Sequence, residues 1–279
     1  MDTEISPYAI TAWRFLIGGA FIAPFAVRQL VKNRQSLSKS SLLAFGALGI
    51  LNVVISMLLL QLAIHYGKAS LSAMIVSMNP LFVSVFAIFI LKEKLNGIQI
   101  AGLGVGVAGL LLIIFTEHDL LSHRYLNLHL GIIFAILAGV TFALYTVLTK
   151  RLVAQYGNLI TNSASFLMGG IALTIINLAI GKSMLFEANI TNLALISYLG
   201  IMVSGVAYLL YFEAMKELTA AKASIYFFLK PAIASVLAFF FLQERLGSMQ
   251  VFGMILIMLA LSRNLFVSLL SHERNQSKA

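Results

Sequence analysis

Long apolar runs alternate with short polar connections along the whole chain. Nine runs reach the roughly 20 residues that a helix needs to cross the hydrocarbon core of a bilayer. They cover about residues 7–28, 42–64, 69–91, 97–115, 129–149, 160–181, 194–215, 221–242 and 248–270. Because hydrocarbon cannot satisfy unpaired backbone groups, each run is predicted to be a helix. The expected fold class is all-α, a polytopic transmembrane helix bundle without a soluble domain.

Composition agrees with this pattern and excludes several classes of protein. Hydrophobic residues make up 60% of the chain and charged residues 10%, whereas soluble domains carry about 25% charged residues. The absence of cysteine excludes disulfides and thiolate metal sites. The net charge of +9 does not indicate nucleic-acid binding, because the basic residues are spread over short loops. The expected surroundings are therefore a lipid bilayer.

The loop charges predict an orientation, because cytoplasmic loops of membrane proteins are enriched in Lys and Arg. If the loop after the first span is cytoplasmic, its side of the membrane holds twelve basic residues and the other side four. The twelve are Arg28, Lys32, Arg34, Lys39, Lys92, Lys94, Lys150, Arg151, Lys216, Lys222, Arg274 and Lys278, and the four are Lys68, Arg124, Lys182 and Arg245. The sequence thus predicts a multi-pass protein of the inner (plasma) membrane with a cytoplasmic C-terminus.

The chain contains an internal repeat at an offset of 151 residues. Residues 79–102 align with residues 230–253, and ten of the 24 positions are identical. The identical pairs include Pro80 and Pro231, Glu93 and Glu244, and Gln99 and Gln250. Shared hydrophobicity alone does not align a proline, a glutamate and a glutamine, so the repeat predicts two related halves.

The same offset maps the first four spans onto the last four and leaves the span at 129–149 without a partner. A repeat with an odd number of helices reverses its orientation in the membrane, as in many secondary transporters. The pattern predicts two inverted repeats in a 5+5 design with the first helix apparently missing, which leaves nine spans here. The domains expected are 1–116 as the first repeat, 129–270 as the second, and 271–279 as a basic cytoplasmic tail.

These repeated segments resemble a known family. A proline inside a helix that ends in LKEKL or LQERL, followed by a glycine-rich helix, occurs twice and is similar to the EamA type of the drug/metabolite transporter superfamily. The Arg14-Phe15 pair resembles that family's second helix. The resemblance implies ten helices in two inverted repeats, a central solute cavity, and efflux of amino acids or other metabolites as the commonest activity.

Two positions near the middle of predicted spans carry the first site hypothesis. Lys230 precedes Pro231, and its repeat partner Asn79 precedes Pro80. A proline inside a helix removes a backbone hydrogen bond and exposes the carbonyl four residues earlier. Because charges inside a membrane are costly and mark functional positions, Lys230 and Asn79 are candidate solute contacts, and the prolines candidate kink or gating positions. A purely structural role for Lys230, paired with backbone carbonyls, is the alternative.

Further candidates are one cation and several aromatic side chains inside the spans. Arg14 always keeps its charge and needs water, carbonyls or an anion, so solute contact and a structural tie are both open. Glu213 is the only carboxylate within a predicted span, and pairing with the nearby Lys216 is the simpler interpretation. The remaining candidate contacts, Trp13, Tyr145 and Tyr226, belong to a set of aromatic residues that could line a cavity or serve as packing and interface anchors. The other members of this set are Tyr208, Tyr211 and Phe227.

The sequence supports neither a cofactor nor a metal. Residues 104–109 match a dinucleotide fingerprint but lie inside a predicted span, where Gly102 and Gly106 favour close helix packing. The histidines have no metal-ligand spacing. The function expected is therefore a secondary transporter of a small solute, not an enzyme. A truncated, non-transporting remnant or assembly subunit is the alternative, a membrane-embedded enzyme is less favoured, and pairing as a homodimer is left open.

Overall fold

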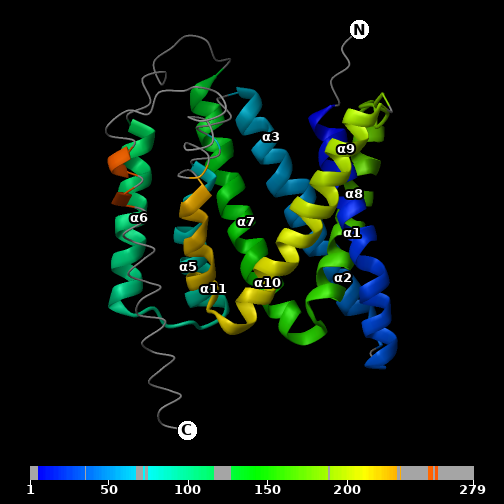
Figure 1. Ribbon diagram of the computed structural model, residues 1–279, viewed down its shortest axis with the longest axis horizontal. Coiled ribbons are helices and arrows are strands. Elements are labelled where there is room, and N and C mark those ends of the chain that lie inside the picture. Colours follow the sequence, from blue (N-terminus) through cyan, green and yellow to red (C-terminus); the bar gives the residue numbers. More distant parts are fainter. Residues whose placement is uncertain are drawn as a thin grey trace. The chain divides into compact units, whose positions relative to one another are not determined.

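The computed structural model describes residues 6–34, 36–66, 72, 75–115, 127–187, 189–230, 233, 251–253 and 255–256. Within these residues every regular element is a helix (Figure 1). Five helices are long and apolar enough to cross a membrane: Tyr8–Lys32, Lys39–Tyr66, His129–Tyr156, Asn158–Ala179 and Ile190–Glu217. This confirms an all-α bundle of apolar helices. Most of the two predicted C-terminal spans lies outside the described residues.

Several of these helices are built from shorter segments. The elements are α1 (Pro7–Lys32), α2 (Lys39–Gly49), η1 (Ile50–Ser56), α3 (Met57–Tyr66), α5 (Asn79–Ile90), α6 (Gly97–Phe115), α7 (Leu128–Tyr156), α8 (Asn158–Ala179), α9 (Ile190–Tyr198), η3 (Leu199–Val206), α10 (Ala207–Glu217), α11 (Ala220–Ile225) and η4 (Tyr226–Phe228). The segments η1 and η3 are π-helical, and η4 is a 3₁₀ turn. Each π segment joins two α-helices end to end.

The chain forms two compact units, each drawn from both halves of the sequence. Unit 1 contains Met1–Leu62 and Leu144–Leu218, and unit 2 contains Ala63–Ala143 and Thr219–Ala279. In unit 1, a shift of 151 residues carries the long helix Lys39–Tyr66 onto Ile190–Glu217. It also places η1 over η3 with a difference of one or two residues at their ends. Unit 1 is thus made of repeat partners.

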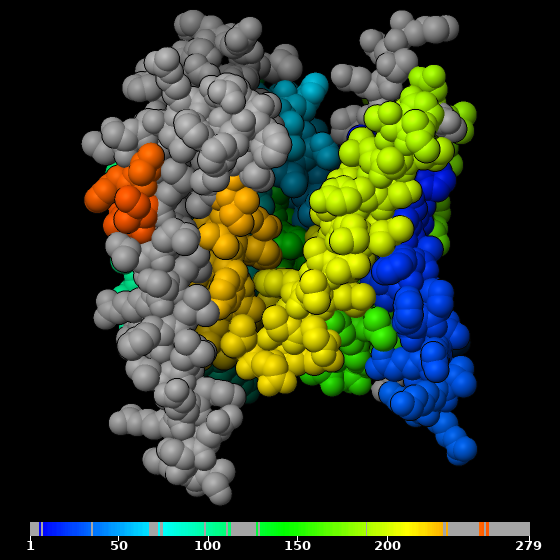
Figure 2. Space-filling model, viewed as in Figure 1, coloured from blue at the N-terminus to red at the C-terminus, as the bar shows by residue number. Residues whose placement is uncertain are grey.

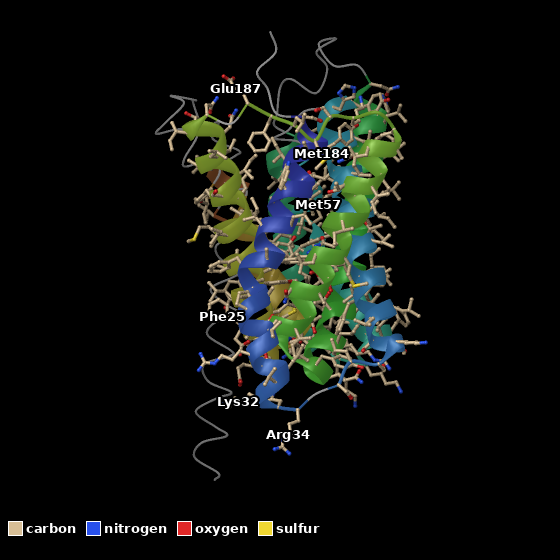
Figure 3. The ribbon with its side chains drawn as sticks, turned by 90° about the vertical axis from the view of Figure 1, so that its right-hand side faces the viewer. Phe25, Lys32, Arg34, Met57, Met184 and Glu187 are labelled. Atoms are coloured by element: carbon tan, nitrogen blue, oxygen red, sulfur yellow. The ribbon has the colours of Figure 1, made fainter. Side chains whose placement is uncertain are left out.

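The repeat partners α1 and α8 lie side by side and run in opposite directions. Gly19 on α1 faces Leu167 on α8, and Gly170 faces Leu16. Residue numbers therefore rise along one helix as they fall along the other, and each contact has its partner at an offset of 151. Figure 3 shows the same inversion, because Lys32 at the end of α1 lies at the opposite end of unit 1 from Met184, which follows α8. These contacts confirm inverted repeats in unit 1.

Two glycine crossings bring the repeats of unit 1 into backbone contact. A Cβ added to Gly18 on α1 would lie 2.8 Å from the carbonyl oxygen of Gly200 at η3. A Cβ added to Gly49 beside η1 would lie 2.7 Å from the amide nitrogen of Gly169 on α8. Gly18 and Gly169 are repeat partners, as are Gly49 and Gly200, so one crossing occurs twice. Figure 2 shows α9 and η3, in yellow-green, lying against α1, in blue.

Unit 2 contains a second packed region, in which α5 lies against α11. Its core includes Leu103, Ile225 and the fully buried Phe228. A Cβ at Gly106 would come within 2.6 Å of the Phe228 ring, so Gly106 serves close packing, as its sequence predicts. Glu93, from the LKEKL motif, caps α11 because its carboxylate accepts hydrogen bonds from the backbone amides at the start of that helix. The amide of Ala220 donates at 2.8 Å.

Candidate functional site

Arg14 lies inside unit 1, on α1, where η3 crosses. Its Nε donates a hydrogen bond to the Ser204 hydroxyl at 3.0 Å, and its guanidinium carbon lies 5.0 Å from the centre of the Phe15 ring. Ser204 is fully buried, whereas Arg14 keeps part of its surface accessible. The contact depends on Gly18, one turn further along α1, because the missing Cβ lets the two helices approach. A charged side chain is thus held within the spanning part of the protein.

Asn52 brings a second polar group to the same region. It belongs to η1, is fully buried, and lies beside the hydroxyls of Tyr145 and Tyr208. The two hydroxyls are near enough to interact with its amide, but neither the amide nitrogen nor the amide oxygen has a partner in hydrogen-bonding geometry. Buried polar side chains are almost always hydrogen-bonded, so an unsatisfied amide indicates a missing partner such as water or a ligand.

Aromatic rings surround these polar groups. Phe15 and Phe166, which are repeat partners, meet edge to face at 5.0 Å between ring centres. The Tyr208 ring lies 5.1 Å from Phe166 and 6.4 Å from Tyr145. An electrostatic interaction also connects Tyr208 with Arg14. We name Arg14, Asn52, Tyr145, Ser204 and Tyr208 the Arg14 cluster.

Sequence reasoning proposed Arg14 and Tyr145, included Tyr208 among the aromatic residues that could line a cavity, and missed Asn52 and Ser204. The structure brings Arg14 and Tyr145 together through Tyr208. A signal for Asn52 existed, because it is an amide near the middle of the predicted span 42–64. Ser204 gave a weaker signal, because a serine inside a membrane helix can bond to the backbone of its own helix.

Trp13 has a different role from its neighbour Arg14. Its indole nitrogen donates to the backbone oxygen of Met184 at 3.0 Å, and its ring meets Phe186 at 6.2 Å between centres. Met184 follows α8 and lies toward the end of unit 1 that carries Glu187 (Figure 3). Trp13 therefore binds the segment that follows α8 to α1 through a hydrogen bond and a ring contact.

The remaining candidates belong to unit 2. Asn79 begins α5 with Pro80 in the first turn, so the structure has a helix start here, after a turn at residues 77–78, and not a kink inside a continuous helix. Asn79 is 1% exposed, and both polar atoms of its side chain lack hydrogen-bond partners. Lys230 is exposed, with its ammonium 3.9 Å from the centre of the Phe227 ring. Tyr226 is 42% exposed, and Pro231 lies outside the described residues.

The carboxylate within the spans is engaged elsewhere. Glu213 forms an ion pair with Lys216 at 2.8 Å, as predicted, and accepts a hydrogen bond from Asn158 at 3.0 Å. Among the residues that the structure describes, no carboxylate pairs with Arg14, and no three acidic or histidine side chains gather to hold a metal ion. The Arg14 cluster is therefore a positive site lined by neutral polar and aromatic groups.

Comparisons with known proteins add the family. The EamA-like transporter family matches residues 1–115 and 129–265. An uncharacterized transporter of Clostridium kluyveri is 35% identical over 91% of this chain and 82% of its own length. The transporter YyaM of Bacillus subtilis is 26% identical over 91% of this chain and 83% of its own.

A solved crystal structure has a similar fold, with a TM-score of 0.77. It is 16% identical and covers 94% of this chain and 88% of its own. At this identity the likeness concerns the fold alone. The relatives are named as transporters and not as enzymes.

Proposed function

Because the chain belongs to the EamA-like transporter family, we propose that this multi-pass membrane protein is a secondary transporter that exports a small organic solute. The solute proposed is an amino acid or a similar metabolite, carried across the cytoplasmic membrane. Export and this class of solute rest on the resemblance of the repeated motifs to the family. The observation that carries the proposal is the Arg14 cluster, a charged and polar site inside apolar helices.

A charge inside a bilayer is costly to insert, and its default interpretation is a functional site such as a solute pathway. Arg14 donates a hydrogen bond to Ser204, lies near Tyr208, and has no counter-ion among the described residues. A transported solute would find there a cation, neutral hydrogen-bonding groups and aromatic walls. Pockets for small molecules combine an apolar lining with a few such polar groups.

The mechanism we propose is alternating access. Inverted repeats are the usual basis of this mechanism, because two related arrangements of similar energy open the site to opposite sides. The antiparallel repeat partners of unit 1 support the proposal. Further proposed contacts are Asn79, Lys230 and Tyr226, and the proposed gating positions are Pro80, at the start of α5, and Pro231.

The test is efflux from proteoliposomes preloaded with single radiolabelled amino acids or organic anions. Wild type should release at least one solute faster than protein-free vesicles, and Lys230→Ala should reduce that rate. Lys182→Ala is the matched control, because Lys182 lies in an exposed connection after α8. Equal rates for wild type and Lys230→Ala would remove Lys230 from the mechanism. No release of any solute from the full panel would overturn the transport proposal.

A further inference from the structure

The Arg14 cluster has the composition of a binding site for a group with a single negative charge. We propose that it binds the carboxylate of the transported solute, with Arg14 as the cation and Asn52 as a neutral donor beside it. The proposal rests on the proposed function and adds the chemical class of the group that is recognised.

Most N–H donors of the Arg14 guanidinium are not used in hydrogen bonds to the described residues. Arginine carries five N–H donors in a planar fork, and in the described structure the side chain makes a single hydrogen bond, from Nε to Ser204. That bond fixes the plane of the guanidinium and leaves the two terminal nitrogens without a hydrogen bond. Paired nitrogens of this kind bind a carboxylate through two parallel hydrogen bonds.

Asn52 is an independent observation at the same place. Its side chain is fully buried, its amide has no hydrogen-bond partner, and Tyr208 lies beside both Asn52 and Arg14. An amide is costly to bury without a hydrogen-bond partner. A bound ligand that supplies this partner would explain why a buried asparagine occurs here. The amide nitrogen can donate to a carboxylate that Arg14 holds.

The backbone at this place is also unusual. Asn52 lies in the π-helical segment Ile50–Ser56, and Ser204 lies in the π-helical segment Leu199–Val206. An α-helix would cross the membrane equally well, whereas π segments are rare and frequently occur at functional sites. Both π segments in the described residues therefore supply a polar side chain to the Arg14 cluster.

Charge decides between a carboxylate and a phosphate. The cluster contains one permanent cation, and its other polar members are neutral. A carboxylate balances that single charge, whereas a phosphate dianion would leave one negative charge uncompensated where desolvation is costly. The partly exposed ring of Tyr208 offers an apolar face to the rest of the solute, and the buried rings of Phe15 and Phe166 pack behind it.

Binding can be measured apart from transport, because Trp13 is the single tryptophan and is next to Arg14 in the chain. Purified protein in nanodiscs is titrated with the common L-amino acids, their carboxamides, 4-methylvalerate, benzoate and inorganic phosphate. Trp13 emission and thermal stability are recorded. At least one carboxylate should bind, with its amide and phosphate at least tenfold weaker. Equal binding of acid and amide, stronger binding of phosphate, or no response to any carboxylate would overturn the proposal.

Variants locate the bound group. Arg14→Gln should weaken carboxylate binding at least tenfold, and Arg14→Lys should recover part of it. Arg151→Gln is the control, because Arg151 is exposed, and should bind as wild type does. Asn52→Leu fills the same space without an unsatisfied amide, so its melting temperature should be no lower than that of wild type. It should bind the carboxylate more weakly, because the amide donor is lost. Wild-type affinity in both Arg14→Gln and Asn52→Leu would overturn the assignment.

The proposed function and this inference can fail separately. Export of a solute without a carboxylate, at the same rate in wild type and Arg14→Gln, would overturn the inference and leave the transporter intact. Carboxylate binding that depends on Arg14, in a protein that releases no solute from liposomes, would support the inference and overturn transport.

Discussion

The crossing of Gly49 with Gly169 allows a sharp test of how unit 1 is held together. In Gly49→Ala the new Cβ would come closest to the carbonyl oxygen of Ser165, and would lie 2.7 Å from the amide nitrogen and 2.9 Å from the Cα of Gly169, whereas ordinary contacts begin at 3.4 Å. All three neighbours are backbone atoms and cannot rotate away. The helices would have to separate by more than 0.7 Å, because the amide nitrogen alone falls short of 3.4 Å by that amount and the Ser165 oxygen lies closer.

The expected cost follows from two opposing effects. Overpacking a close contact costs about 1–3 kcal/mol, and replacing glycine by alanine inside a helix returns about 1 kcal/mol. Because three backbone atoms lie within 3.0 Å of the added Cβ, the upper end of the first range applies, and the net destabilisation expected is about 2 kcal/mol. For a chain of this size each kcal/mol lowers the melting temperature by roughly 2–4 °C. We expect Gly49→Ala to melt about 5 °C below wild type.

Gly46→Ala is the matched control on the same helix. A Cβ at Gly46 would lie 3.1 Å from the terminal methyl of Met168, and that flexible side chain can move aside. Its melting temperature should equal or exceed that of wild type. Unfolding is followed by far-ultraviolet circular dichroism of the purified protein in one detergent. If Gly49→Ala and Gly46→Ala melt together, backbone contact at this crossing does not determine the stability of unit 1.

Two further outcomes are expected. Glu93→Gln should lower the melting temperature by a few degrees, because loss of a charged cap costs about 1 kcal/mol. Glu217→Gln, at an exposed position, is the control and should leave the melting temperature unchanged. Equal melting temperatures of the two variants would show that Glu93 does not stabilise α11. The chain has no cysteine, so Ser36→Cys and Ser183→Cys can report orientation: an impermeant maleimide should label the second in intact cells and the first only after permeabilisation. The reverse pattern would contradict the predicted orientation.

Hydropathy and the repeat predicted most of the described fold. The predicted span 97–115 agrees with α6, and the predicted span 160–181 agrees with α8 within two residues at each end. These predictions succeed because burial in lipid requires about 20 apolar residues whatever their identity. The offset of 151 residues was found from one pair of similar segments, 79–102 and 230–253. It also relates pairs of helices that lie outside those two segments.

The π-helical segments could not be predicted in the same way. Hydropathy indicates which residues enter lipid, but it carries no information on the backbone hydrogen-bond pattern that distinguishes a π-helix from an α-helix. By hydropathy alone, Ile50–Ser56 therefore resembles any apolar α-helix. Asn52 barely alters the mean hydropathy of its span, and a search that ranks charges first overlooks it. For the same reason Lys230 stood out in the sequence, although in the structure it is exposed over Phe227.

The contact between Arg14 and Ser204 joins residues 190 positions apart in the chain. A ribosome that adds about 5–20 residues per second needs roughly 10–40 s to pass from one to the other. During biogenesis α1 therefore enters the membrane before its partner exists, carrying a charge whose insertion costs up to about 2.5–3.5 kcal/mol, the value for a helix centre. The cost of inserting Arg14 thus arises before the Ser204 hydroxyl is made, and slower synthesis would lengthen that interval.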